Sequence, residues 1–153
     1  MTLLSPTVSP DAAGRTVPAR DLGYLLIRLA LGVNILAHAL ARTGGNYDKF
    51  VAWAGGLFAT TPLPAWAVGV FARAVPPAEG VIGLLLILGL FTSWAAVAGG
   101  LLMIALIFGM AMVQNWEIVG VQMIYVAFYA ALVALADHDR FSLDRLRHAR
   151  PGR

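Results

Sequence analysis

Polar side chains lie inside long apolar runs of this chain, where a charge or an unpaired hydrogen-bonding group is costly. Such groups form buried ion pairs, carry protons or bind a small polar ligand. The candidates are Arg28, Asn34, His38, Arg73, Glu79, Gln122, Tyr125 and Tyr129. The last three recur at i, i+3 and i+7, the spacing of one helix face. We expect these eight side chains to line one polar site inside a membrane.

The composition predicts that site to be embedded in an integral membrane protein. Of the 153 residues, 59% are hydrophobic and 12% are charged, against about 25% charged in a soluble domain. A helix needs about 20 apolar residues to cross hydrocarbon, and four runs qualify: 22–41, 66–90, 93–113 and 118–136. Short links favour antiparallel neighbours. The expected fold is an all-α membrane protein with a four-transmembrane-helix bundle, held in the lipid bilayer.

The one long link, 42–65, predicts an additional short helix between the first and second spans. Its apolar residues recur at helical spacing, at Phe50, Trp53 and Leu57. Asn46 or Asp48 is the expected N-cap, and the helix is expected to end at Phe58. We expect it to lie at the membrane interface or to cap the bundle.

The chain divides into a disordered arm (1–20), a four-helix membrane domain (21–137) and a basic tail (138–153). The arm carries Arg15 and Arg20, and five further arginines lie in the tail, whereas the opposite side holds only Arg42 and Lys49. Because Lys and Arg are retained on the cytoplasmic side, both termini are predicted to be cytoplasmic. The expected location is a bacterial inner membrane.

Counting along the expected helices predicts two polar levels. Arg28 is expected beside Glu79, and His38 beside Arg73, with Asn34 between the levels. The alternative is that Arg28 and Glu79 form a structural pair that only fixes the helix register. The Pro76–Pro77 pair removes two amide donors from the second span. This predicts a bend near Glu79 and freed carbonyl groups near residues 72 and 73 that need new partners.

Several chemistries are not supported by the sequence. It contains no cysteine, which excludes disulfides and thiol chemistry within this chain. No phosphate-binding loop, dinucleotide fingerprint or clustered metal ligands occur, and no nucleic-acid module is present. His38 and His138 are expected near opposite membrane faces, so a bis-histidine haem is not expected.

The motifs resemble those of the DoxX family of small four-helix membrane proteins, related to the DoxD subunit of thiosulfate:quinone oxidoreductase. The matching stretches are "LIRLALGVNILAHALAR" (26–42), "FATTPLP" (58–64) and "VPPAEGVIGLLLILGLFTSWAA" (75–96). Family members typically have Arg, Gly and His along the first helix, matched here by Arg28, Gly32 and His38. The chain departs from the family pattern at Ser93, where an Arg is common, and at Ala39, where a Gly is common.

The resemblance implies a link to membrane redox processes, often beside an oxidoreductase partner protein. The first hypothesis is therefore a redox-linked membrane subunit that binds a quinone or a similar ligand between the first, second and fourth spans. Arg28, His38 and Arg73 are expected to hydrogen-bond the ligand, with Glu79 as proton acceptor and Tyr125 and Tyr129 against its ring. No tightly bound cofactor is expected. The alternative is a non-enzymatic scaffold or small-solute carrier with structural buried charges. A homo-oligomer is also expected to be feasible, because Gly99–Gly100 allows close helix contact.

Overall fold

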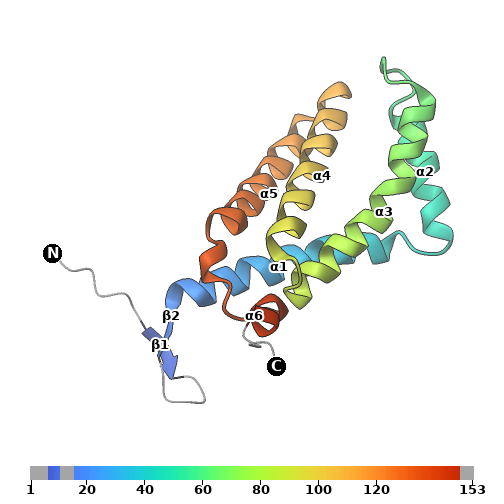
Figure 1. The fold of residues 1–153 in the computed structure, drawn as a ribbon. Coiled ribbons are helices and arrows are strands. Elements are labelled where there is room, and N and C mark those ends of the chain that lie inside the picture. The colour runs from blue at the N-terminus through green and yellow to red at the C-terminus, as the bar shows by residue number, and fades with distance from the viewer. Residues whose placement is uncertain (1–6, 11–15, 149–153) are drawn as a thin grey trace.

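A computed structural model of the chain describes residues 7–10 and 16–148 (Figure 1). Four of its helices are long and apolar enough to cross a membrane. They are α1 (Ala19–Ala41), α3 (Ala65–Leu88), α4 (Thr92–Met112) and α5 (Trp116–Ala134). The prediction of an all-α membrane protein with four spans is therefore confirmed. The additional helix in the long link is α2 (Gly45–Leu57).

Shorter elements flank the four spans. Within the predicted arm, β1 (Thr7–Pro10) and β2 (Thr16–Pro18) pair as antiparallel strands directly before α1. After α5 come the 3-10 helix η1 (Ala136–His138) and the short helix α6 (Leu143–His148). An ion pair between Asp21 and His138 joins the beginning of α1 to the segment after α5. The α3–α4 link lies at the same end of the bundle. We call this end the tail side.

Helices α1 and α3 pack closely because two glycines lie between them. A Cβ atom on Gly83 would lie 2.8 Å from the Leu36 amide nitrogen and 2.9 Å from the Gly32 carbonyl oxygen. A Cβ atom on Gly32 would lie 2.9 Å from the Ile87 side chain. Small residues allow two membrane helices to approach to backbone distance, so these contacts fix the register of α1 against the C-terminal half of α3.

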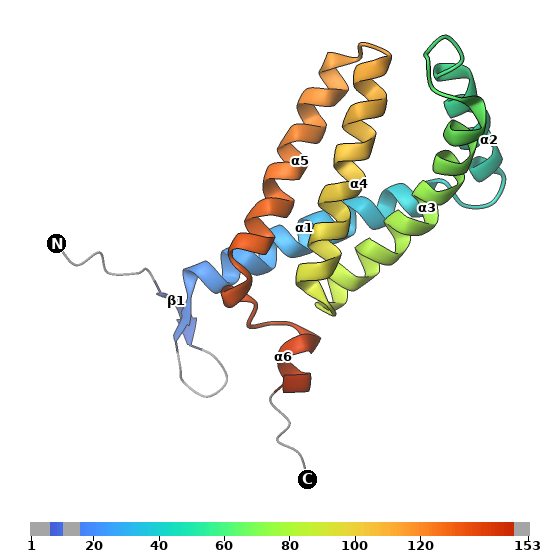
Figure 2. The ribbon, with the colours of Figure 1, turned by 45° about the horizontal axis from the view of Figure 1, so that its top comes forward.

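The N-terminal half of α3 extends beyond α1 and packs against α2 instead. Ala54 of α2 and Val68 and Ala72 of α3 form a small buried cluster. Helix α3 continues through Pro76 and Pro77, and it bends along its length as predicted (Figure 2).

The freed carbonyl group at residue 73 has a partner on α2. Pro77 has no amide hydrogen to donate to the residue four positions earlier, and the Tyr47 hydroxyl donates to that carbonyl oxygen, on Arg73, at 2.8 Å.

The predicted N-cap of α2 was wrong, because the cap position is Gly44, with a φ of 58°, and no side chain caps it. Asn46 instead donates to the Ala41 carbonyl oxygen at 3.2 Å and so stabilises the end of α1.

Helices α4 and α5 form the second close pair, side by side in both views (Figures 1 and 2). A Cβ atom on Gly99 would overlap the Tyr129 ring, so this glycine accommodates a buried side chain of its own chain. The expectation of a glycine-mediated contact between chains therefore finds no support at Gly99.

Three tryptophans lie near the ends of the spans. Trp66, Trp94 and Trp116 lie in the first turns of α3, α4 and α5 and are 65–77% exposed, as is typical of residues at membrane interfaces.

The glycine contact predicts that Gly83→Ala destabilises the protein. Alanine is ordinarily the better helix former, but here the added methyl group meets backbone atoms that cannot yield without separating α1 from α3. We expect a loss of about 1–3 kcal/mol, measured by thermal or denaturant unfolding in mild detergent. Gly80→Ala is the matched control, since its Cβ atom would lie 3.6 Å from Ala39, an ordinary contact. Equal stability of the two variants would contradict the prediction.

Candidate functional site

A cavity of about 560 Å³ lies among all five long helices, α2 included. It occupies the region where α4 and α5 diverge from α2 and the first half of α3 (Figure 2). Its wall is mostly apolar, with Phe50, Trp53 and Phe71 among the aromatic residues. Six of the eight predicted site residues line it: Asn34, His38, Glu79, Gln122, Tyr125 and Tyr129. Arg28 and Arg73 do not.

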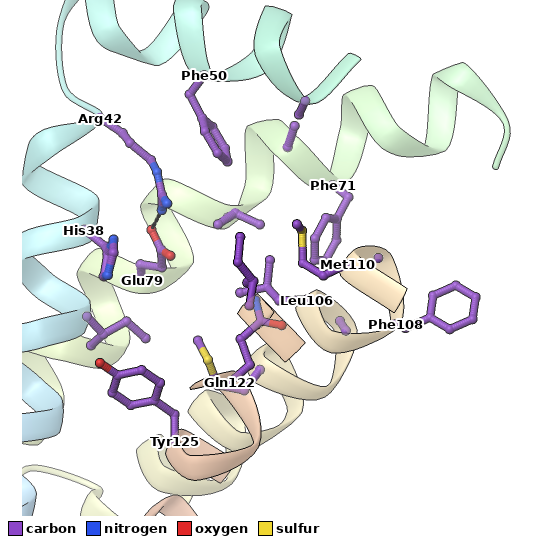
Figure 3. Close-up of a pocket in the computed structure, with 18 of the residues that line it drawn as sticks. His38, Arg42, Phe50, Phe71, Glu79, Leu106, Phe108, Met110, Gln122 and Tyr125 are labelled. Carbon is purple, nitrogen blue, oxygen red and sulfur yellow. Dashed lines mark hydrogen bonds and ion pairs between the residues drawn. The ribbon is translucent and has the colours of Figure 1, made fainter. Parts of the chain in front are cut away.

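An ion pair between Arg42 and Glu79 forms part of the cavity wall (Figure 3). Glu79 is 3% exposed, and the arginine supplies the charge that allows a carboxylate to remain buried. The guanidinium carbon also lies 4.4 Å from the centre of the Phe50 ring, a cation–π contact that holds the head group against α2.

Arg42 is the site residue that the sequence analysis missed. It was counted only as a positive charge in the link beyond the first span. Its position four residues after His38 was a usable signal, because residues at i and i+4 share one helix face. Arg42 is the residue immediately after α1, at its C-cap, and its long side chain reaches back to the carboxylate of α3.

The remaining polar groups reach the cavity from two helices. Asn34 and His38 come from α1, and Gln122, Tyr125 and Tyr129 come from α5. Among the described residues, Gln122 Oε1 is buried and has no hydrogen-bond partner. The cavity therefore offers hydrogen-bond donors and acceptors on an otherwise apolar wall, an arrangement typical of a small-molecule site.

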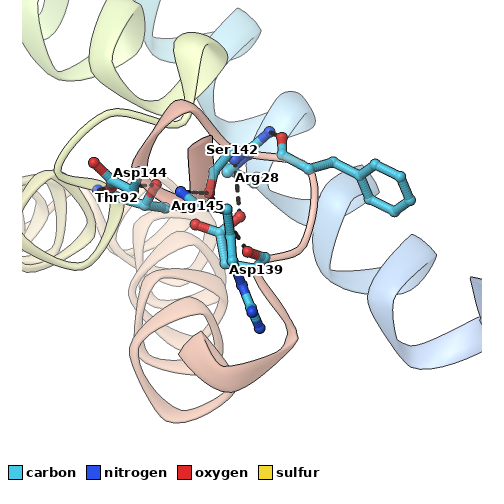
Figure 4. Close-up of polar contacts among 7 residues, drawn as sticks. Arg28, Thr92, Asp139, Ser142, Asp144 and Arg145 are labelled. Carbon is cyan, nitrogen blue, oxygen red and sulfur yellow. Dashed lines mark hydrogen bonds and ion pairs between the residues drawn. The ribbon is translucent and has the colours of Figure 1, made fainter. Parts of the chain in front are cut away.

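The predicted pair of Arg28 with Glu79 is wrong. The α1–α3 contacts place Gly80 against Ala39 and Gly83 against Leu36, so Glu79 lies about 12 residues, or some 18 Å, from the level of Arg28 at 1.5 Å per residue. Arg28 instead donates to Asp139 at 2.9 Å and to the Phe141 carbonyl oxygen at 2.6 Å (Figure 4). It is 2% exposed.

Residues 136–145, which we call the docked segment, cover the tail side of the bundle around Arg28. Asp144 accepts a hydrogen bond from the Thr92 amide at 3.0 Å, and its own amide donates to the Gly89 carbonyl oxygen at 3.0 Å (Figure 4). Asp21, which is 4% exposed, pairs with His138 at 2.9 Å and with Arg140 at 3.2 Å. Part of the predicted tail is thus bound to α1 and to the α3–α4 link.

Gly89 shows how closely this segment approaches the helices. It ends α3 in the left-handed conformation, with a φ of 65°, where glycine is the favoured residue. A Cβ atom here would also overlap Arg28 and lie 2.7 Å from the Ser142 side chain. A larger residue at this turn would therefore displace the arginine from its partners.

The predicted contact of His38 with Arg73 is also wrong. The Arg73 side chain is exposed and donates to the Gly69 carbonyl oxygen of its own helix at 3.0 Å. Gly69 and Arg73 are one helical turn apart, so this bond does not join two elements. No three His, Asp or Glu side chains gather as metal ligands within residues 7–10 and 16–148.

A family model described as methylamine utilisation protein MauE matches residues 20–120, more than half of the chain. The chain belongs to the MauE family. This match supports the predicted relationship to a family of small membrane proteins but does not identify DoxX specifically, and an integral membrane protein is supported. No curated protein and no solved structure matches the chain.

The part matched to MauE covers α1 to α4 and the beginning of α5. It includes the Arg42–Glu79 pair and the two polar α1 residues of the cavity, Asn34 and His38. Gln122, Tyr125, Tyr129 and the docked segment lie beyond it. The family match therefore covers most of the cavity lining, and the lining residues beyond it all belong to α5.

The docked segment predicts a large effect for Asp139→Ala. Removing this carboxylate leaves the Arg28 charge buried without a counter-charge, which costs about 3–5 kcal/mol for a buried pair. We expect a lower unfolding temperature in detergent and faster tryptic cleavage at Arg140. The control is Asp137→Ala, which removes the same charge from an exposed position in the same segment. Similar behaviour of the two variants would show that Asp139 does not compensate Arg28.

Proposed function

We propose that this MauE-family protein is a DoxX-like, redox-linked membrane subunit that binds a quinone in the cavity. The observation that carries the proposal is the Arg42–Glu79 pair in the wall of a mostly apolar cavity of about 560 Å³. A quinone has matching chemistry, with a flat apolar ring and two carbonyl oxygens that accept hydrogen bonds. A fully polar solute would leave most of this wall without suitable contacts.

Each polar group of the cavity has a role in the proposal. Arg42 and His38 donate hydrogen bonds to one quinone oxygen, and Asn34 and the Gln122 amide group are available to the other. Phe50 and Tyr125 supply aromatic contacts to the ring. Tyr129 packs against Gly99 and forms part of the cavity wall. Arg28 and Arg73, which lie outside the cavity, are left out of the ligand site.

Reduction of a quinone to a quinol consumes two electrons and two protons. Glu79 is the carboxylate placed to transfer protons to and from the ligand. The electrons come, in this proposal, from an oxidoreductase partner, because a chain without cysteine cannot relay them through thiols. The family description, methylamine utilisation protein, supports a partner that oxidises a small amine, and we extend it to this chain as part of the proposal.

The proposal places the protein in a bacterial inner membrane with both termini in the cytoplasm. The Asp21–His138 pair supports termini on one side, and the excess of arginine in the terminal segments favours the cytoplasm. The Arg42–Glu79 pair, at the end of α1 away from the termini, would then lie toward the periplasm.

A structural scaffold or a small-solute carrier is the second candidate. It is favoured by the mutual satisfaction of Arg42 and Glu79, which need no ligand to compensate their charges. In that case the pair would only join α1 to α3, and the cavity would be filled by lipid or solvent. Ligand binding by variants that lack the pair separates the two candidates.

We therefore predict that the Arg42→Gln/Glu79→Gln double variant folds but binds quinone at least tenfold more weakly. Removing both charges leaves neither one buried alone, while the ligand loses a charge-assisted hydrogen bond of about 1.5–3 kcal/mol. Binding of a short-chain ubiquinone analogue can be followed by quenching of tryptophan fluorescence, since Trp53 lines the cavity. Arg73→Gln, a charge change outside the cavity, serves as control.

The measurement also has a decisive negative result. If the wild type binds neither ubiquinone nor menaquinone analogues, and purifies without either, the quinone proposal is wrong. A double variant that binds as tightly as the wild type would place the ligand elsewhere. If the wild type binds no quinone and the Arg42→Gln/Glu79→Gln variant is stable, the scaffold or carrier is supported.

A further inference from the structure

A second, smaller hollow lies between α1 and α5. Its volume is about 410 Å³, and we call it the α1–α5 groove. Its lining is almost entirely apolar and comprises Leu26, Ile27, Ala30, Leu31, Asn34, Tyr125 and Phe128. None of the residues of α2, α3 or α4 contributes to it. The groove thus belongs to the face on which α1 meets α5.

The groove adjoins the cavity. Leu31, Asn34 and Tyr125 line both, so the two hollows meet at these three side chains. The Tyr125 hydroxyl is directed from α5 toward α1 at this boundary (Figure 3). The only polar side chains of the groove, Asn34 and Tyr125, therefore lie where the groove meets the cavity.

The outer part of the groove is exposed on apolar helices, and in a membrane it would face hydrocarbon. Leu26 is 68% exposed and Phe128 is 44% exposed, and both belong to membrane-spanning helices. Leu31 and Asn34 of α1, and Tyr125 and Phe128 of α5, lie toward the middle of their helices rather than at the ends. An occupant of the groove would therefore be apolar and would arrive sideways from the lipid.

We propose that the α1–α5 groove holds the apolar tail of the ligand and is its lateral route from the bilayer into the cavity. The inference rests on the proposed function and adds the ligand class, an amphipathic molecule with a long isoprenoid or alkyl chain. The head group occupies the cavity beside Arg42 and Glu79. The chain passes between Asn34 and Tyr125 and lies along Ala30 and Phe128.

This arrangement gives the two polar residues at the boundary, Asn34 and Tyr125, a specific role in binding. A ring with oxygens on opposite edges needs a polar group at each end. Arg42 and His38 serve one end, and Asn34 lies four residues, about 6 Å, from His38 along α1. Asn34 and Tyr125 can therefore hydrogen-bond the second oxygen at the point where the polar head changes to the apolar chain.

The test compares ligands with and without a tail in the full-length protein, reconstituted in lipid nanodiscs. Ala30→Trp fills the groove from a position that lines the groove but not the cavity. Ala37→Trp is the control, an equal change at an exposed position of the same helix that lines neither hollow. The probes are a ubiquinone analogue without a tail and one with several isoprene units. Because both partition into the bilayer, each dissociation constant is given as a ratio of quinone to lipid.

We expect Ala30→Trp to weaken the long-tailed quinone at least tenfold, the loss expected from about two buried methylene groups. Its affinity for the tail-less analogue should remain within about twofold of the wild-type value, and Ala37→Trp should change neither. A photoreactive group on the long tail should label the groove, including Leu26 and Phe128. Excess tail-less analogue should abolish this labelling, because both ligands compete for the cavity.

The outcomes distinguish the groove from the cavity. If the tail-less analogue binds but Ala30→Trp leaves the long-tailed affinity unchanged, the groove is not the tail site and the proposed function stands. If excess tail-less analogue leaves the labelling of the groove unchanged, the groove takes up apolar chains independently of the cavity, as it would take up lipid chains. That result would overturn the inference. If the wild type binds neither probe, the proposed function is wrong and the inference fails with it.

Discussion

The close contact of Gly83 with α1 sets the level of Glu79 relative to Arg28 and Arg42. Because Gly83 approaches the backbone at Leu36 and Gly32, α1 and α3 can pair in only one register. That register brings Glu79 beside the end of α1, where Arg42 reaches it. It also leaves Arg28 far from any acidic group of α3, so its compensation must come from the docked segment.

The two buried arginine pairs are built in different ways. Arg28 is 2% exposed, is bound by Asp139 and by the Phe141 carbonyl oxygen, and lines neither of the two hollows described above. Arg42 has one acidic partner, one aromatic neighbour and open space beside it. The Arg28–Asp139 pair is therefore suited to holding segments of the chain together. The Arg42–Glu79 pair lines a cavity and is suited to binding and releasing a ligand.

The sequence predicted the parts of the fold that depend on local composition. Run lengths placed the four spans within a few residues of the observed helices, and apolar spacing revealed α2. The three α5 residues spaced at i, i+3 and i+7, Gln122, Tyr125 and Tyr129, do face one cavity. The proline pair correctly indicated a bend and a freed carbonyl group, although the partner, Tyr47, was not foreseen.

The sequence failed where the outcome depended on register between helices. Depth counting assumed that all spans begin and end at the same two levels, but α3 extends past α1 to reach α2. As a result Glu79 was predicted beside Arg28, and Arg42 was left in the link between the first two spans. The contact of Asp139 with Arg28 was equally hard to foresee. Nothing in an apparently basic tail indicates that two of its aspartates bind α1 and the α3–α4 link.

The separation of Arg28 from Asp139 has a consequence for biosynthesis. The two residues are 111 positions apart, so at about 5–20 residues per second the arginine waits roughly 6–20 s for its partner to be translated. During that time α1 must be inserted with a charge that costs about 2.5–3.5 kcal/mol at membrane depth. Insertion machinery, lipid head groups or water must solvate this arginine until Asp139 has been translated and has docked. The neutralisation of Arg28 is therefore a late event in assembly.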